Sequence, residues 1–268
     1  MSDLLRGLLA LGVGAGVALL VVAVLRRWSP GGASRWERQN YRGRRVHLAA
    51  GPALVLAGVA GGALGAGGLR AALGVAAAGL IAGAVGLFDD LSGDSATKGL
   101  RGHLVALRHG RLTSGAVKIP ALVVAGLLAG VTVHGITWRA VLDGGFVAGV
   151  ANLVNLLDLR PGRAAKVLLA GAGVCLAFGA TAAAGPAGAT LALLPGDLRE
   201  RVMLGDAGAN GAGAAVAASA LAAIKLPTLI AGLVVVAALT LLSERVSFSA
   251  LIDRTPALRW LDQLGRVQ

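Results

Sequence analysis

Carboxylates and amides stand in three clusters at the ends of long apolar runs, and these side chains are the ones best suited to chemistry. Asp89 and Asp90 follow one run, Asp158 closes another, and Asp206 precedes a third. A carboxylate at mid-bilayer depth costs roughly 2.5–3.5 kcal/mol on insertion scales, so acidic residues beside such runs generally have a function. We expect the clusters to form one polar site for a divalent metal and a diphosphate, because Mg²⁺ prefers oxygen ligands shared with phosphates.

The first cluster opens a long polar loop. Adjacent carboxylates such as Asp89 and Asp90 repel each other, so one of them usually turns toward a cation or a metal. Lys98 lies a short distance further along and is placed to neutralise them or to contact a phosphate. The alternative is a pair of solvated acids at a helix end, with basic residues that only reflect membrane topology.

The second cluster has helical spacing. Asn152, Asn155 and Asp158 stand at i, i+3 and i+6, which places them on one stripe of a helix. Two amides and a carboxylate on a stripe have no role facing lipid, although a hydrogen-bond network between helices is an alternative. Arg160 and Arg163 follow directly and suit the negative charge of a phosphorylated substrate.

The third cluster places Asp206 between Gly205 and Gly208 where the next apolar run begins. The two glycines allow backbone to approach a ligand closely, and the start of a helix offers free N–H groups to an anion. Asp206 is therefore our first candidate for a metal ligand. The alternative is an ordinary helix cap in a glycine-rich turn.

The elements that position these clusters are predicted to be membrane helices. The 268 residues are 56% hydrophobic and only 14% charged, with a mean hydropathy of +0.77, which is far from globular averages of about 45–50% and 25%. A span needs about 20 apolar residues. Nine apolar segments are expected to be spans, most of them of this length, over residues 4–25, 48–66, 69–88, 119–137, 139–157, 167–181, 182–195, 207–224 and 226–243.

The positive charge supports one orientation of these spans. If residues 26–47 face the cytoplasm, then 89–118, 158–166, 196–206 and the tail 244–268 do too, and these segments hold 21 of the 25 Lys and Arg residues. Such a bias is the positive-inside pattern, so the net charge of +12 needs no nucleic acid. With only 3% aromatic residues, stacking on bases is also excluded. The N-terminus is then outside and the C-terminus cytoplasmic.

Two segments need a more specific interpretation. Residues 167–195 are too long for one span, and Gly185 with Pro186 predicts a turn between two short ones. In the tail, apolar residues at helical spacing around Thr255 and Pro256 predict two short amphipathic helices along the membrane interface. Cys175 stands alone, so no disulfide is expected. We expect one all-α membrane domain over residues 1–268.

In this order the motifs resemble those of the polyprenyl-phosphate N-acetylhexosamine-1-phosphate transferases, which include phospho-N-acetylmuramoyl-pentapeptide transferase and bacterial GlcNAc-1-phosphate transferases. That family has Asp-Asp after one span, N-x-x-N-x-x-D at the end of a later one, and G-D-x-G at the start of another. Here the matching residues are Asp89 and Asp90, Asn152 to Asp158, and Gly205 to Gly208. The resemblance covers roughly residues 40–245.

The chain also departs from the family. A G-L-D-G stretch usually follows the N-x-x-N-x-x-D motif, whereas Leu159, Arg160, Pro161 and Gly162 stand here. Residues 226–268 contain no His, although the family carries a His motif in this region. The Pro-Thr-x-Gly-Gly-like motif at the entry to the second span is only partly kept in residues 46–51. Nine spans are expected where the family usually has ten. The resemblance is therefore to a divergent member.

The resemblance implies transfer of a sugar-1-phosphate, from a nucleotide sugar such as a UDP-N-acetylhexosamine to polyprenyl phosphate, at the bacterial cytoplasmic membrane. Mg²⁺, or Mn²⁺ in its place, would be held by Asp206 and Asp90. The catalytic residues would be Asp89, Asp90 and Asp158. Substrate contacts would come from a larger set: Lys98, Asn152, Asn155, Arg160, Arg163, Gly205 and Gly208. A homodimer stays open, as do two other functions: an inactive binding or assembly subunit and a cation-coupled transporter.

Overall fold

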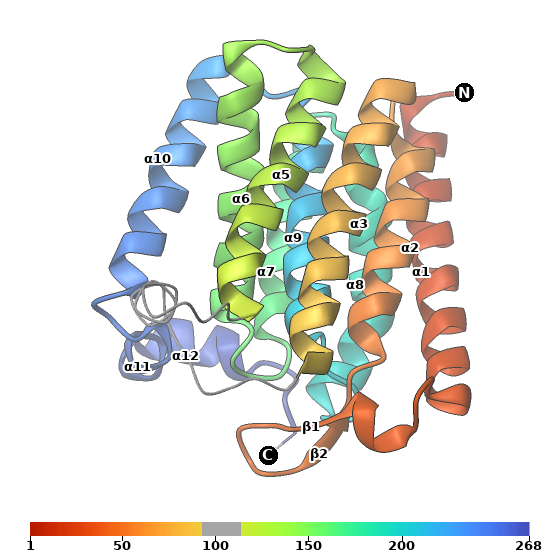
Figure 1. Ribbon diagram of the computed structural model, residues 1–268, viewed down its shortest axis with the longest axis vertical. Helices are drawn as coiled ribbons and strands as arrows, with labels where there is room; N and C mark the ends of the chain where they lie inside the picture. Colours follow the sequence, from red (N-terminus) through yellow and green to blue (C-terminus); the bar gives the residue numbers. More distant parts are fainter. Residues whose placement is uncertain (93–113, 268) are drawn as a thin grey trace.

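A computed structural model describes residues 1–92 and 114–267, and the described part is a bundle of helices that run side by side (Figure 1). Each apolar segment expected from the sequence corresponds to one helix, which confirms the all-α prediction for this part of the chain. The helices are α1 (Asp3–Trp28), α2 (Ala50–Gly65), α3 (Leu69–Ser92), α5 (Ser114–His134), α6 (Trp138–Leu157), α7 (Arg163–Ala177), α8 (Ala184–Leu198), α9 (Gly205–Ala220) and α10 (Leu226–Ser243).

Among the described residues, five helices are long and apolar enough to cross a membrane: α1, α3, α5, α6 and α10. These five indicate a multi-pass membrane protein. The helices α2, α7, α8 and α9 have 15 or 16 residues each. At 1.5 Å per residue they are about 22–24 Å long, shorter than the roughly 30 Å of a bilayer core.

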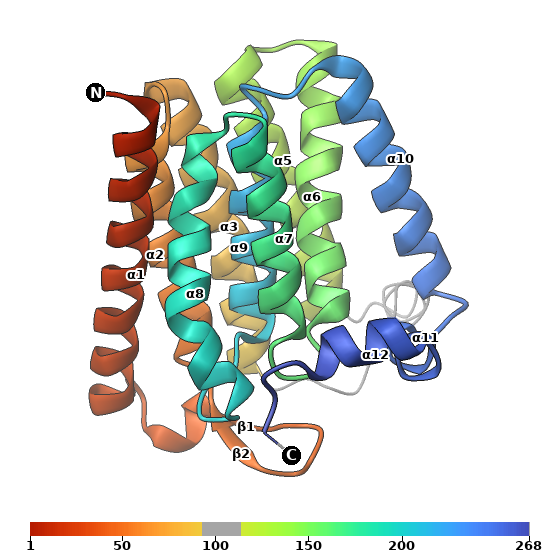
Figure 2. The ribbon, with the colours of Figure 1, turned by 180° about the vertical axis from the view of Figure 1, so that it is seen from behind.

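Helix α9 forms the centre of the bundle and packs against α2, α3, α6 and α7 (Figures 1 and 2). It consists almost entirely of glycine and alanine, and nearly all of its residues are buried. Small residues let its backbone lie directly against its neighbours. A Cβ atom added at Gly86 of α3 would meet the carbonyl oxygen of Asp206 at 2.3 Å, so the first turn of α9 touches the last turns of α3.

The turn between α7 and α8 lies earlier than the sequence predicts. Residues 178–183 make the reversal, and Gly185 and Pro186 belong to the first turn of α8. A proline is tolerated in a first helical turn because the N–H that it lacks has no helical partner there. Gly185 serves close helix packing instead, since an added Cβ would lie 2.0 Å from the backbone nitrogen of Gly62 in α2.

Residues 26–47, predicted as a loop, contain defined structure beneath the bundle (Figure 1). After a short 3₁₀ helix η1 (Ala33–Trp36), strand β1 (Glu37–Gln39) pairs antiparallel with β2 (Arg45–His47). The side-chain oxygen of Asn40 accepts hydrogen bonds from the N–H groups of Arg42 and Arg44 and closes the hairpin. Strands of three residues carry too little alternation to be found in a sequence.

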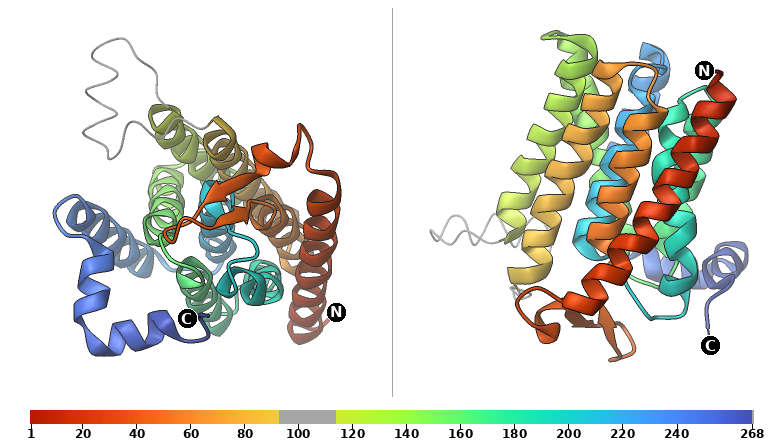
Figure 3. Two further views of the ribbon diagram at one scale, coloured as in Figure 1. Left: turned by 90° about the horizontal axis from the view of Figure 1, so that it is seen from below. Right: turned by 90° about the vertical axis from the view of Figure 1, so that its right-hand side faces the viewer.

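The tail folds as expected into two short helices, α11 (Phe248–Arg254) and α12 (Pro256–Gln263), which lie across the same end of the bundle as the hairpin (Figure 3). Their apolar residues Leu251, Leu258 and Leu261 are exposed, whereas Asp262 is buried. The tail therefore docks on the bundle through the polar side chain of Asp262 and not through these leucines.

Candidate functional site

The three clusters lie together at the end of the bundle that carries the hairpin and the tail. The Asp90 carboxylate accepts hydrogen bonds from the backbone N–H groups of Asp206 (3.0 Å) and Ala207 (2.9 Å). These donors belong to the first turn of α9, whose N–H groups have no partner within the helix. Asp90 thus ties the end of α3 to the start of α9, across 116 residues of sequence.

The hairpin also contacts this junction. The Arg38 guanidinium donates through Nη2 to the backbone carbonyl of Asp90. Its Nη1 donates to the carbonyl of Glu37 at 2.8 Å, which fixes the side chain over the end of α3. A basic residue from the hairpin therefore lies beside the acidic cluster.

The glycines of the third cluster let protein segments approach each other. Gly205 has φ of +61°, and an added Cβ would lie 2.8–3.1 Å from the carboxylate of Asp90. At Gly208 an added Cβ would lie 3.0 Å from the Cα of Gly51 in α2. These contacts explain both glycines without a ligand, and their contact with a substrate stays a prediction.

Lys118, near the start of α5, links the first and third clusters. Its Nζ lies 2.5 Å from Asp206 Oδ2 and 3.4 Å from Asp89 Oδ2. The three side chains are only 14%, 27% and 20% exposed, in the order Lys118, Asp206, Asp89. One ammonium group thus bridges two carboxylates in a setting with little water, where the attraction is only weakly screened.

The second cluster joins this group through Asn155. With its amide nitrogen facing Asp206, Nδ2 lies 2.9 Å from Asp206 Oδ1, and the amide oxygen lies 3.2 Å from Lys118 Nζ. Asn155 therefore contacts both members of the ion pair, as expected for a residue of the site. Asn152 lies about one turn further into α6 and is half-buried, and its side chain forms no hydrogen bond with another described residue.

Asp158 caps the end of α6 and faces the other acids. Burial raises the pKa of Asp158 well above its usual range, and the nearby charges of Asp197, Asp206 and Asp90 act in the same direction. A carboxyl group in this environment holds a proton more readily than a solvated one. Asp158 also lines a cavity of about 400 Å³ that extends toward the hairpin, with Asp197 and Glu200 on its wall.

The cationic residues that the sequence predicts as substrate contacts do not lie together. The Arg160 guanidinium stacks over the ring of Tyr41, with its central carbon 4.1 Å from the ring centroid. Arg163 is buried and holds Asp262 of the tail, with Nε 2.7 Å from Oδ1 and Nη2 3.1 Å from Oδ2. Arg163 could contact a substrate only if its ion pair with Asp262 opened, so the predicted substrate contact of Arg163 stays a prediction. Lys98 lies outside the described residues.

Two residues of the site were missed in the sequence. Lys118 is a single cation at the edge of an apolar run, and that position was its only signal. Asn210 follows Asp206 by four residues, and its Nδ2 donates to the Asp206 carbonyl at 2.7 Å. The Asn210 Oδ1 atom is buried and has no hydrogen-bond partner among the described residues. A lone amide in a glycine–alanine helix was a signal for a polar neighbour.

The donor set fits Mg²⁺ in part. In the described ranges, no group of three His, Cys, Asp or Glu side chains is arranged to hold a metal. Mg²⁺ commonly takes one or two carboxylates and completes its shell with water and substrate phosphates. Asp206 and Asp89 could supply those carboxylates if Lys118 moved aside, whereas both oxygens of Asp90 already accept backbone N–H groups. Metal binding by Asp206 stays a prediction. The metal role expected for Asp90 is also untested, and its two hydrogen bonds make it less suited to that role than Asp89.

Comparison of the chain with protein-family models and with curated proteins returned no match.

Proposed function

We propose that this protein is a membrane enzyme that transfers a sugar-1-phosphate from a nucleotide sugar to polyprenyl phosphate. The observation that carries the proposal is the assembly of Asp89, Lys118, Asn155 and Asp206 at one end of a bundle of apolar helices. Such a site offers carboxylates to a metal, and a cation and an amide to phosphate oxygens. A substrate with a long prenyl chain would reach it from the surrounding membrane.

In the reaction, an oxygen of the lipid phosphate would form a bond to the sugar-bearing phosphorus of the donor. The bond between the two donor phosphates would break, and the nucleoside monophosphate would leave. When bound, Mg²⁺ supplies positive charge that stabilises the diphosphate as negative charge builds on the leaving group. Asp206 and Asp89 would hold the ion, and Lys118, released from them, would contact a phosphate oxygen.

Asp158 is suited to proton transfer. Its raised pKa means that the carboxylate is a stronger base than a solvated aspartate, so it would accept a proton from the attacking lipid phosphate. Asp90 would act by position, because it fixes the first turn of α9 and hence the backbone around Asp206. Asn155 would orient Asp206 through its amide.

For the membrane arrangement, we propose nine spans with the site at the cytoplasmic face of a bacterial cytoplasmic membrane. The short helices α2, α7, α8 and α9 would cross together with the five long ones, as members of the same bundle. The bias of 21 of 25 Lys and Arg residues supports this orientation. The N-terminus would be outside and the tail cytoplasmic.

A second candidate is a catalytically inactive member that binds a lipid or a partner for envelope synthesis. The observation in its favour is that Lys118 neutralises Asp206 and that the described residues show no ready metal site. A cation-coupled transporter fits less well, because transporters place ionisable sites near the bilayer midplane. Here the three acidic clusters stand together at one end of the helices.

The test is release of UMP or CMP by the purified protein, from a panel of nucleotide sugars with added polyprenyl phosphate and Mg²⁺. We expect Asp206→Asn to abolish release while the protein still folds. Asp3→Asn is the matched control, because the Asp3 side chain is 82% exposed at the far end of the molecule. Normal release by Asp206→Asn at low Mg²⁺ would show that the metal assignment is wrong. No release by the wild type with any donor would favour the binding protein.

A further inference from the structure

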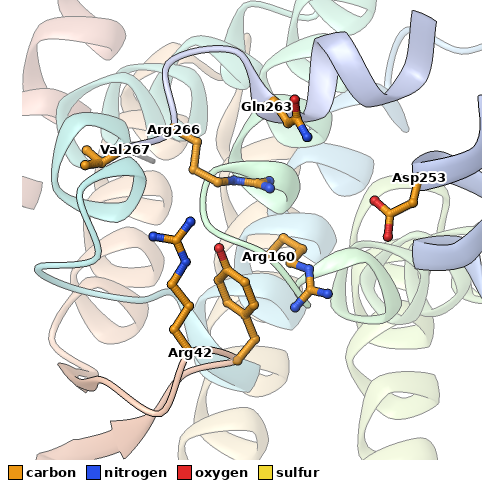
Figure 4. Close-up of a pocket in the computed structure, with 7 residues that line it drawn as sticks. Arg42, Arg160, Asp253, Gln263, Arg266 and Val267 are labelled. Atoms are coloured by element: carbon orange, nitrogen blue, oxygen red, sulfur yellow. The ribbon is translucent and has the colours of Figure 1, made fainter. Parts of the chain in front are cut away.

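A second cavity at the same end of the bundle has a different character from the acidic cluster. Its volume is about 390 Å³, within the range typical of small-molecule sites. Three separate parts of the chain build it: the hairpin, the turn after α6, and the tail. Its lining residues are Tyr41, Arg42, Arg160, Asp253, Gln263, Arg266 and Val267 (Figure 4). We call it the arginine pocket.

The lining of the arginine pocket holds three arginines and one carboxylate, that of Asp253, which forms no ion pair among the described residues. The positive charge of the pocket is therefore incompletely balanced. Arg42 lies 3.4 Å from the buried Glu200, and Arg266 lies 3.0 Å from Asp262. Arg160 contacts the face of Tyr41 and pairs with no carboxylate among the described residues. Glu200 is itself shared with Arg44, so one carboxylate serves two guanidinium groups. An anion entering the pocket would relieve this imbalance.

The guanidinium groups are held in place before any ligand arrives. Arg266 Nε donates to the carbonyl of Pro161 at 3.2 Å, and its side chain is only 10% exposed. The buried Arg266 Nη2 lies close to Asp262 but in a geometry that makes no hydrogen bond with any described residue. Arg160 is held against the ring of Tyr41, with its central carbon 4.1 Å from the ring centroid. Figure 4 shows the three arginines around the pocket. Planar guanidinium groups around a shared space are suited to phosphate oxygens.

We propose that the arginine pocket binds a phosphate-bearing ligand, with Arg160 as the principal contact and Arg42 and Arg266 as its supports. The source of the phosphate is either a soluble diphosphate compound or the headgroup of an anionic lipid. The adjoining 400 Å³ cavity shares Tyr41 and Arg160 with the pocket and reaches Asp158. A ligand held here would lie next to the acidic cluster without occupying it.

This binding does not require the proposed transfer reaction, so it is measured without turnover. Inorganic pyrophosphate is titrated by calorimetry into the purified full-length protein, in neutral detergent with EDTA. We expect binding by the wild type, and an affinity roughly 10- to 100-fold weaker for Arg160→Gln, because a charge-assisted contact is lost. Arg259→Gln is the matched control: Arg259 is exposed on α12 and outside the pocket.

Further arms distinguish the site and the source. Lys118→Met removes the cation that the acidic cluster could offer to phosphate, and it should bind pyrophosphate as the wild type does, which separates the pocket from the acidic cluster. For the lipid source, thermal stability is compared in phosphatidylcholine nanodiscs with and without phosphatidic acid, and the gain should be lost in Arg160→Gln. Arg42→Gln provides a second pocket variant if Arg160→Gln does not fold. Absence of both effects in the wild type, or equal effects in the pocket variants, overturns the proposal.

Discussion

Replacing Lys118 by methionine removes the cation that lies between Asp206 and Asp89 while keeping a side chain of similar length. Unit charges 2.5 Å apart attract by about 7 kcal/mol at an effective dielectric constant of 20. Desolvation of the lysine offsets much of this attraction. We therefore expect a loss of about 2–4 kcal/mol in the free energy of unfolding, between the values for a charged hydrogen bond and a fully buried ion pair.

The same substitution should increase the response to Mg²⁺. Without Lys118, the positive charge between the carboxyl groups of Asp206 and Asp89 is gone, and a divalent cation can take its place. A ligand at 100 times its Kd stabilises the folded state by about 2.7 kcal/mol, so Mg²⁺ should recover much of the lost stability. In the wild type, Mg²⁺ must displace the ammonium group first, and the gain should be smaller.

Thermal unfolding in detergent, with EDTA or with increasing Mg²⁺, measures both effects. Lys225→Met is the matched control, because Lys225 is exposed at the opposite end of the bundle and forms no ion pair with a described residue. It should unfold like the wild type and show the same dependence on Mg²⁺. If Mg²⁺ stabilises Lys118→Met no more than the wild type, these carboxylates do not form the metal site.

Three further predictions concern the tail, the junction of α3 with α9, and orientation. Asp262→Asn should undock the tail, at a cost of about 3–5 kcal/mol because Arg163 is left buried without its partner, and hydrogen exchange in α11 and α12 should rise. Burial opposes ionisation of Asp262, but Arg163 and Arg266 outweigh it and hold its pKa below the usual value. Docking should therefore be complete above about pH 4 and weaken as the pH falls through the lowered pKa; a tail that docks equally well in strong acid would contradict this. Gly205→Ala should destabilise the protein and reduce any activity, since φ of +61° and the nearby Asp90 carboxylate exclude a methyl group, whereas Gly173→Ala meets open space and should be neutral in thermal unfolding. The orientation is tested in intact cells with a variant in which Cys175 is replaced. An added Ile136→Cys should react with an impermeant thiol reagent, and an added Ser34→Cys should not. The reverse pattern would invert the proposed orientation.

The sequence by itself was sufficient to locate the helices. The apolar runs fix where the helices of the bundle form, and the structure confirms a helix at every expected segment. The tail helices were also predicted, because Thr255 and Pro256 carry a local start signal that depends on no distant residue. The turn in residues 167–195 was misplaced, since Gly185 looks like a turn residue in isolation and is needed for contact with α2.

The partners of the site residues were decided by tertiary structure alone. A helical stripe predicts that Asn155 and Asp158 share a face, but which helix meets that face depends on how the bundle packs. Lys118 joins the site because α5 lies beside α3 and close to the start of α9, 88 residues from Asp206. Arg163 turns to the tail, and Arg160 to the hairpin, for the same reason. Side-chain pairing follows the rotation and contact of helices that are distant in sequence, and local periodicity carries no record of either.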